Sequence, residues 1–280
     1  MPLFQRPDGK LVEGQSPVRT IMPYLMRGRN ESFILHDMLL DLSRTLPWLK
    51  AFNAHRPEQE RATLFQLYLW ACARALHARP GLNRFVSGGR IYQRNEVSIS
   101  FAAKRQMRDD APFVTIKLAF PKDEPFDACI GRIRSFVHEG RSGKTRAVDT
   151  EVNLATRLPG FVLKAGVHAL RALDDMNLMP GAMIANDPMF SSLFAANIGS
   201  VGIDDVAHHL YEYGSCSVFG VVGRVKKTVF VGDDDRPVVR DGLKIRWTFD
   251  ERINDGLYCA ASLGIARTVL EDPASVIKEP

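Results

Sequence analysis

The sequence is poor in cysteine and has no closely spaced cysteine pair. Four cysteines are present, none of them in a C-x-x-C arrangement, and each stands in an apolar run: Cys72, Cys129, Cys216 and Cys259. Disulfide frameworks and zinc sites need spaced cysteine sets, so we expect four buried free thiols in a reducing, cytoplasmic setting. The seven histidines do not pair at ligand spacing with each other or with cysteines, so we expect no metal site.

Long apolar runs and basic clusters are also missing. No stretch approaches the ~20 apolar residues that cross a membrane, and residues 1–16 lack the apolar core of a signal peptide. The 37 basic and 32 acidic residues are scattered, and the short cluster at residues 224–227 is typical of a solvated strand end. We find no internal repeat and no low-complexity linker. The sequence therefore predicts a soluble protein that binds neither nucleic acid nor membrane.

The 280 residues are 45% hydrophobic, enough for one large domain or two small ones. Apolar periodicity predicts helices over residues 58–78, 126–139, 158–176 and 255–270. Alternation predicts strands over residues 90–93, 97–103, 113–120, 215–222, 227–231, 238–240 and 243–250. Residues 141–150 are expected to be a loop, and residues 181–186 and 190–200 a loop followed by a strand. Residues 19–28 fit a helix start or a loop, and residues 30–42 fit a helix or a strand. Mixed elements with strands crowded late in the chain favour an α+β sandwich.

One segment near the end resembles a known signature. Asp250-Glu251-Arg252-Ile253-Asn254-Asp255-Gly256 is similar to the D-H-R-x-x-D-G of the acyltransferase core in 2-oxo acid dehydrogenase complexes. Chloramphenicol acetyltransferase carries a related H-x-x-x-D-G. Other segments follow the family's order: residues 79–85 at its helix-to-strand junction, 97–103 at an early strand, 197–202 at its S-N-x-G-x-x-G turn, and 215–223 at a later strand. The resemblance runs from about residue 19 to residue 270.

The resemblance implies a chloramphenicol acetyltransferase-like two-layer sandwich of class α+β, with a mixed β-sheet and helices packed on one face. This core domain would span residues 17–272, between an N-terminal arm of residues 1–16 and a C-terminal tail of residues 273–280. The family forms trimers whose active sites lie between neighbours, entered by coenzyme A from one end and by the acyl acceptor from the other. The lipoyl and subunit-binding domains of the dehydrogenase complexes do not precede this core, so a free-standing homotrimer is expected.

Two positions depart from the family's chemistry. The general base of the family, a histidine that deprotonates the acceptor, corresponds here to Glu251, and the Ser or Thr that donates to the oxyanion corresponds to Ala196. Such a base gives a rate gain of roughly 10²–10⁴, and one oxyanion donor gives about 10²–10³. Asn197 is a poor substitute for the hydroxyl, because neighbours in a strand point to opposite faces. Asp255, the family's scaffold residue for the loop, is retained, as is Gly256.

Several alternatives stay open at these positions. Glu251 is either structural, in a salt bridge with Arg252 or a neighbouring subunit's arginine, or a catalytic carboxylate whose pKa burial would raise. His208 and His209 mimic the H-H-x-x-x-D-G of peptide-synthetase condensation domains, although Tyr213 stands where the Asp belongs. The alternative interpretation is that these two histidines lie in a surface loop, at a trimer contact or over the channel. The candidate substrate-binding residues are thus His36, near the acceptor channel, Asn197, His208 and His209.

The expected function is a pseudoenzyme of this family. It would act as a scaffold, as a binder of coenzyme A or acyl-coenzyme A, or as a partner of a catalytically intact relative or acyl carrier. The alternative is an active acyltransferase that uses Glu251, His208 or His209 as base on an unknown acceptor. A third interpretation is a non-catalytic subunit of a dehydrogenase complex, against which the missing lipoyl and subunit-binding domains count.

Overall fold

A computed structural model of the chain describes residues 5–104, 113–141 and 156–278. Its centre is a mixed seven-stranded sheet, in which β5, β7 and β8 are parallel and the other pairings are antiparallel. The strands lie in the order β2 (Phe33–Asp41), β10 (Pro237–Asp250), β8 (Val218–Val222), β7 (Leu193–Asn197), β5 (Ser98–Lys104) and β6 (Phe113–Ala119). The remaining strand, β9 (Lys226–Val231), pairs only with the outer half of β10.

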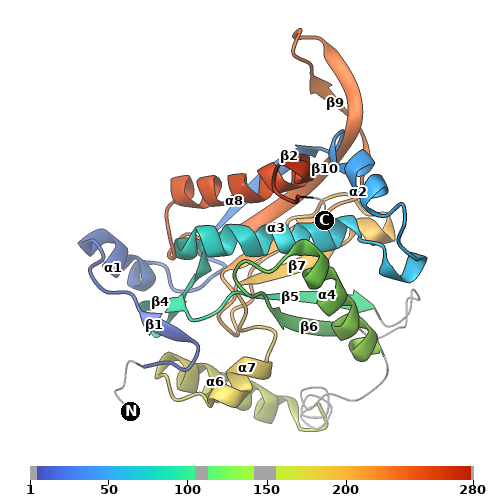
Figure 1. Ribbon diagram of the computed structural model, residues 1–280. Coiled ribbons are helices and arrows are strands. Elements are labelled where there is room, and N and C mark those ends of the chain that lie inside the picture. Colours follow the sequence, from blue (N-terminus) through green and yellow to red (C-terminus); the bar gives the residue numbers. More distant parts are fainter. Residues whose placement is uncertain (1–4, 105–112, 142–155, 279–280) are drawn as a thin grey trace.

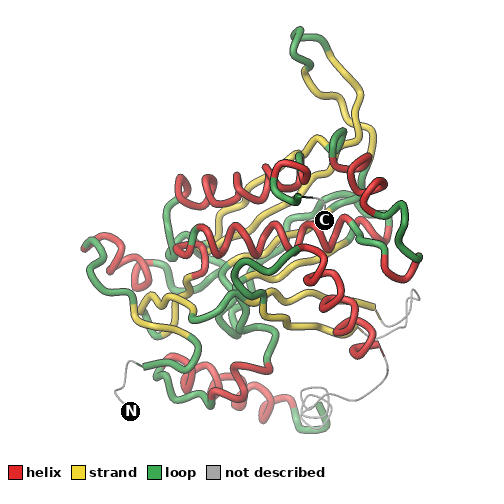
Figure 2. Tube along the Cα trace, viewed as in Figure 1, coloured by secondary structure: helices red, strands yellow, loops and turns green. Residues whose placement is uncertain are grey.

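Helices cover one face of this sheet, as Figures 1 and 2 show. They are α2 (Thr45–Phe52), α3 (Leu64–Ala78), α4 (Phe126–Arg141) and α8 (Gly256–Glu271). Buried aromatic side chains fill the space between the layers, with the rings of Tyr68 on α3 and Trp247 on β10 5.8 Å apart. The predicted two-layer α+β sandwich, with a mixed sheet and helices on one face, is therefore confirmed. We call the other face, which these helices leave uncovered, the second face.

A smaller unit lies beside the main sheet. Strands β1 (Gly9–Leu11), β4 (Arg90–Arg94) and β3 (Arg84–Ser87) form a three-stranded sheet, near which lie α1 (Pro17–Leu25), α6 (Gly160–Asp175) and α7 (Gly181–Asn186) (Figure 1). Arg6 holds the N-terminal segment here: its side chain is 0% exposed and lies 2.8 Å from Asp174 of α6. It also donates to Asp8 and to Ser87. No helix among the described residues is long and apolar enough to cross a membrane.

Several element boundaries differ from the sequence prediction. The helix expected over residues 58–78 begins only at Leu64, because Thr63 and Gln66 form a capping box there. Residues 238–240 and 243–250 belong to one strand, β10, and not to two. Residues 181–186 form a short helix where a loop was expected, and residues 30–42 resolve as a strand. The loop expected over residues 141–150 falls outside the described residues except for the last residue of α4.

Candidate active site

The loop that carries the acyltransferase-like signature follows directly from β10. The backbone N–H of Asp250 donates to the carbonyl of Ser217 at 2.9 Å, and that of Glu251 donates to the carbonyl of Ser32 at 2.8 Å. Ser32 lies just before β2 and Ser217 just before β8, the two neighbours of β10. The loop is thus tied to both adjacent strands of the sheet.

A buried ion pair closes this loop. Asp250 is 0% exposed and Arg252 is 4% exposed. The guanidinium of Arg252 donates from Nε to Oδ1 of Asp250 at 2.9 Å and from Nη2 to Oδ2 at 2.8 Å. Ser32 Oγ also donates to Asp250, at 3.1 Å, and Arg252 Nη1 donates to the carbonyl of Met26, at 3.1 Å. Such a bidentate geometry is the strong form of a carboxylate–arginine contact.

The pairing of Glu251 with Arg252, one of the expected roles for this carboxylate, is wrong. Arg252 is already paired with Asp250, at 2.8 Å between Nη2 and Oδ2. In the described part of the chain the carboxylate of Glu251 makes no hydrogen bond or ion pair, although its backbone is held at both ends. The side chain is half-buried. A contact with a neighbouring subunit's arginine stays a prediction.

Arg19 of α1 links the first helix to the loop and to α8. Its Nη1 donates to the carbonyl oxygen of Glu251 at 2.9 Å, and its Nη2 lies 3.8 Å from the carboxylate of Asp255. Asp255 caps α8 by accepting a hydrogen bond from the backbone N–H of Tyr258 at 2.7 Å. Asp255 and Arg19 therefore fix the far end of the Glu251 loop.

The register of the sheet separates Ala196 from Glu251 within one chain. Ala196 on β7 is level with Val221 on β8, which is level with Arg246 on β10. Glu251 lies five residues further along, which corresponds to about 17 Å at ~3.4 Å per residue. Two strand spacings also lie between β7 and β10. The two family positions therefore do not meet inside one subunit.

The predicted substrate-binding residues are divided between the two faces of the sheet. His36 on β2 is opposite Trp247, so its side chain is on the helix-covered face, where Trp247 lies in the core. Ala196 packs with Phe194 and Phe219 on the second face. Asn197, the next residue, turns the chain after β7: its side-chain oxygen accepts from the backbone N–H of Ser200 at 3.2 Å.

His208 lies on the second face, in a loop that crosses the sheet. Its ring stacks on Phe219, with centroids 3.9 Å apart, and on His209, with centroids 4.8 Å apart. Its Nδ1 donates to the carbonyl of His209 at 2.7 Å, which leaves Nε2 as the unprotonated nitrogen of a neutral ring. Burial lowers the pKa of His208, against the hydrogen bond to the His209 carbonyl, which raises it. Burial therefore favours the neutral form of His208, and the ring is on the same face as Ala196.

A row of four charges borders this second face. Arg246 contacts Asp205 and lies 3.0 Å from Asp37, while Lys244 lies 3.1 Å from Asp37 and 3.2 Å from Asp205. Burial alone would raise the pKa of Asp205, but hydrogen bonds from Arg246 and Lys244 outweigh it and lower the pKa. The loop over residues 204–208 is thereby fixed to β10.

The remaining groups show no sign of redox or metal chemistry in the described residues. The four cysteines are free and buried, and burial raises the pKa of Cys129 and of Cys259 to about 12. Among the described residues no cluster of three or more His, Cys, Asp or Glu is placed to hold a metal ion.

Sequence reasoning missed the residues that hold the site together. Arg19, Ser32 and Met26 contact the Glu251 loop across more than two hundred residues of sequence. The one sequence feature that could have pointed to these contacts was the charged residue Arg19, at the start of the region of resemblance. The partner of Arg252 was an acidic residue two positions before it, in the signature itself.

Comparison with solved structures shows which fold this is. No protein-family model matches the chain, and no curated protein matches it by sequence. A probable dihydrolipoamide acetyltransferase from Listeria monocytogenes 4b F2365 is 18% identical with a TM-score of 0.61, over 96% of this chain and 97% of that one. The dihydrolipoamide acetyltransferase of Azotobacter vinelandii is 15% identical with a TM-score of 0.60, over 92% and 87%.

A chloramphenicol acetyltransferase is also similar, at 11% identity and a TM-score of 0.56, over 94% of this chain and 99% of that one. The matches thus cover nearly the whole length of both chains at low identity. This chain has the chloramphenicol acetyltransferase-like fold that the catalytic cores of dihydrolipoamide acetyltransferases share.

Proposed function

We propose that this chain is an acyltransferase-family protein that keeps the fold and the base-bearing loop but lacks the usual histidine and serine chemistry. It would serve as a scaffold or as a binding partner for coenzyme A or acyl-coenzyme A, acting beside a catalytically intact relative or an acyl carrier. The observation that most supports this proposal is that the residues holding the loop are kept while the two reactive positions are replaced. Arg19, Arg252 and Asp255 hold the loop, while the reactive positions carry Glu251 and Ala196.

The Azotobacter protein supports the assignment of these positions. A serine, a histidine and an asparagine are studied there for their role in the catalytic mechanism, and the last two are four positions apart. Glu251 and Asp255 have the same separation here. A carboxylate at the histidine's position places negative charge near the oxyanion of the tetrahedral intermediate, which opposes the transition state. Alanine at the hydroxyl position offers no donor in its place.

We also propose a homotrimer. The hairpin of β9 and β10 extends beyond the sheet (Figure 1) and exposes one apolar face, on which Val229, Val231 and Val239 are 63%, 74% and 64% exposed. A two-stranded hairpin is marginally stable alone in water, and exposed apolar patches mark contacts. Packing of this arm on a neighbouring copy would bury the valines. Because Ala196 and Glu251 are far apart in one chain, they could face each other only across such a contact.

A second candidate is an active acyltransferase in which His208 is the base. The observation that favours it is the neutral imidazole, with Nδ1 donating to a backbone carbonyl and Nε2 left as the proton acceptor. His208 also shares the second face with Ala196. A second group that could act as the base is Glu251 itself, whose carboxylate is unpaired within the described chain.

One assay separates these candidates. Purified full-length protein is given acetyl-coenzyme A with dihydrolipoamide or chloramphenicol, and coenzyme A binding is measured by calorimetry. We expect binding without transfer above the buffer rate. A turnover near the ~10 s⁻¹ typical of enzymes would contradict the proposal. Loss of that turnover in His208→Gln, or in Glu251→Gln, would then identify the base.

A further inference from the structure

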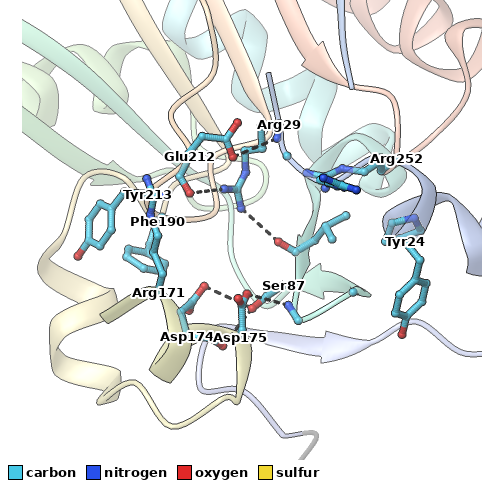
Figure 3. A pocket seen from close by; sticks show the side chains of 17 residues that line it. Tyr24, Arg29, Ser87, Arg171, Asp174, Asp175, Phe190, Glu212, Tyr213 and Arg252 are labelled. Atoms are coloured by element: carbon cyan, nitrogen blue, oxygen red, sulfur yellow. Dashed lines mark hydrogen bonds between the residues drawn. The ribbon is translucent and has the colours of Figure 1, made fainter. Parts of the chain in front are cut away.

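A polar cleft of about 500 Å³ lies between the end of α1, the β3–β4 turn, the end of α6 and the segment 212–214. Its volume is in the range of small-molecule sites. Figure 3 shows Arg29 beside Glu212 at one wall, with Asp174 and Asp175 on the opposite side. Among the described residues that line it, Arg252 is the one that belongs to the signature loop; Glu251, Ala196 and His208 do not line it. The cleft thus borders the signature loop but does not include the positions expected to be reactive.

The carboxylates of this cleft are already engaged by the protein. Glu212 accepts hydrogen bonds from the backbone N–H groups of Arg29 and Asn30, at 3.2 and 2.8 Å. Asp174 is paired with Arg6 at 2.8 Å, and Asp175 accepts from the backbone N–H of Gly88 at 3.0 Å. Each of these three carboxylates therefore already has a hydrogen-bond or ion-pair partner within the protein.

Arg252 is paired with Asp250, but the other three arginines of the cleft have no carboxylate partner among the described residues. Arg29 is 6% exposed, yet its guanidinium donates only to backbone carbonyls, those of Tyr211, Glu212 and Val86, and its buried Nε has no partner. Burial lowers the pKa of Arg29, more than the neighbouring Asp250 raises it. A buried cation without a carboxylate partner is costly, and an anion nearby would offset that cost.

Two further arginines stand at the exposed rim. The side chains of Arg27 and Arg171 form no hydrogen bond or ion pair within the described residues. Their planar guanidinium groups suit carboxylate or phosphate oxygens, to which they can donate two parallel hydrogen bonds. Tyr24 adds an aromatic wall on the side of α1, where an apolar part of a ligand could rest.

We propose that this cleft binds a small organic anion bearing carboxylate or phosphate groups, which Arg27 and Arg171 hold directly while Arg29 supplies positive potential from below. This inference goes beyond the proposed acyl-coenzyme A binding and does not rest on it. Citrate and inorganic phosphate are suitable probes, since they separate a preference for carboxylates from one for phosphate.

The test is calorimetric titration of the full-length wild type and of the double variant Arg27→Gln/Arg171→Gln with each probe. The wild type should bind at least one probe saturably, at roughly millimolar concentration or below. The double variant should bind it at least about tenfold more weakly, because each charge-assisted hydrogen bond is worth about that factor. Both arginines are exposed, so their loss should leave the fold unchanged. The control Arg61→Gln/Lys122→Gln also removes two positive charges, from exposed positions that do not line the cleft.

A second arm separates this cleft from the acyl-coenzyme A site. Saturating coenzyme A should leave probe binding unchanged, and the double variant should keep its coenzyme A affinity. The proposal is overturned by absence of saturable binding of both probes, by equal affinity in the wild type and the double variant, or by competition with coenzyme A. Failure of coenzyme A to bind at all would count only against the proposed function.

Discussion

Arg252 turns its guanidinium back onto Asp250, with Nε 2.9 Å from Oδ1 and Nη2 2.8 Å from Oδ2. The residues on either side of Glu251 therefore form an ion pair with each other. Glu251 has no ionic partner in the described chain. The same pair closes the loop that follows β10. The proposed function is based on this difference between the residues that hold the loop, which are paired, and Glu251 at the reactive position, which is not.

Removing one member of this pair should be severely destabilising. Arg252→Ala leaves the carboxylate of Asp250, which is 0% exposed, without its cation. We expect a loss of about 3–5 kcal/mol in the free energy of unfolding, as for other broken buried pairs. Urea denaturation at fixed protein concentration measures it. Arg224→Ala is the matched control, because its pair with Asp204 is about half exposed, is screened by solvent and should contribute little to stability. Equal losses in the two variants would contradict the role given to Arg252.

The hairpin arm should determine the oligomeric state. Val229→Glu/Val239→Glu places two charges on the apolar face of the arm, where contact with a neighbour would have to bury them. Light scattering at micromolar concentration should give the wild type about three times the 31.3 kDa chain mass, and the variant the mass of one chain. Val167→Glu, on the exposed side of α6, is the control and should leave the mass unchanged. A wild type that scatters as a single chain would refute the trimer.

His208 should make stability depend on mildly acidic pH. Its folded-state pKa is lowered by burial below the ~6.5 of a free imidazole. The stability that its neutral form allows is present above about pH 6.5 and is lost as the pH falls through the lower folded-state pKa. NMR titration should place the His208 resonance below the value for the unfolded chain. His208→Phe preserves the stack on Phe219 and should remove part of the acid loss in urea midpoints. An unshifted His208 resonance would show that the ring is solvated.

The sequence was informative where a local signal was strong. The alternation in residues 97–103 and 243–250 predicts strands of the sheet, and Asp255 followed by Gly256 marks the start of α8. The order of the segments also predicts the acyltransferase-like sandwich, which the similar structures confirm. Thr63, whose side chain caps α3, was the local signal overlooked in setting the start of that helix.

The contacts of the site join residues that are far apart in the sequence, and no local sequence pattern predicts such contacts. Arg19 reaches the carbonyl of Glu251 across 232 positions, and the stack of His208 on Phe219 depends on how a loop crosses the sheet. That His36 and Ala196 lie on opposite faces follows from strand register, which is set by pairings between distant segments. The pairing of Arg252 with Asp250 could likewise not be predicted, because a sequence gives no side-chain direction in a tight turn.

Restoring the two missing groups tests the central claim most directly. If only the chemical groups were lost, Ala196→Ser with Glu251→His should rebuild a hydroxyl and an imidazole that face each other between neighbouring copies of the proposed trimer. The measurement is thiol-dependent deacylation of acetyl-coenzyme A by the double variant, each single variant and the wild type. We predict a rate for the double variant above the wild type, with a smaller gain in each single variant, since base and donor act on one transition state. A folded, trimeric double variant that binds coenzyme A but deacylates it no faster than the wild type would contradict the account.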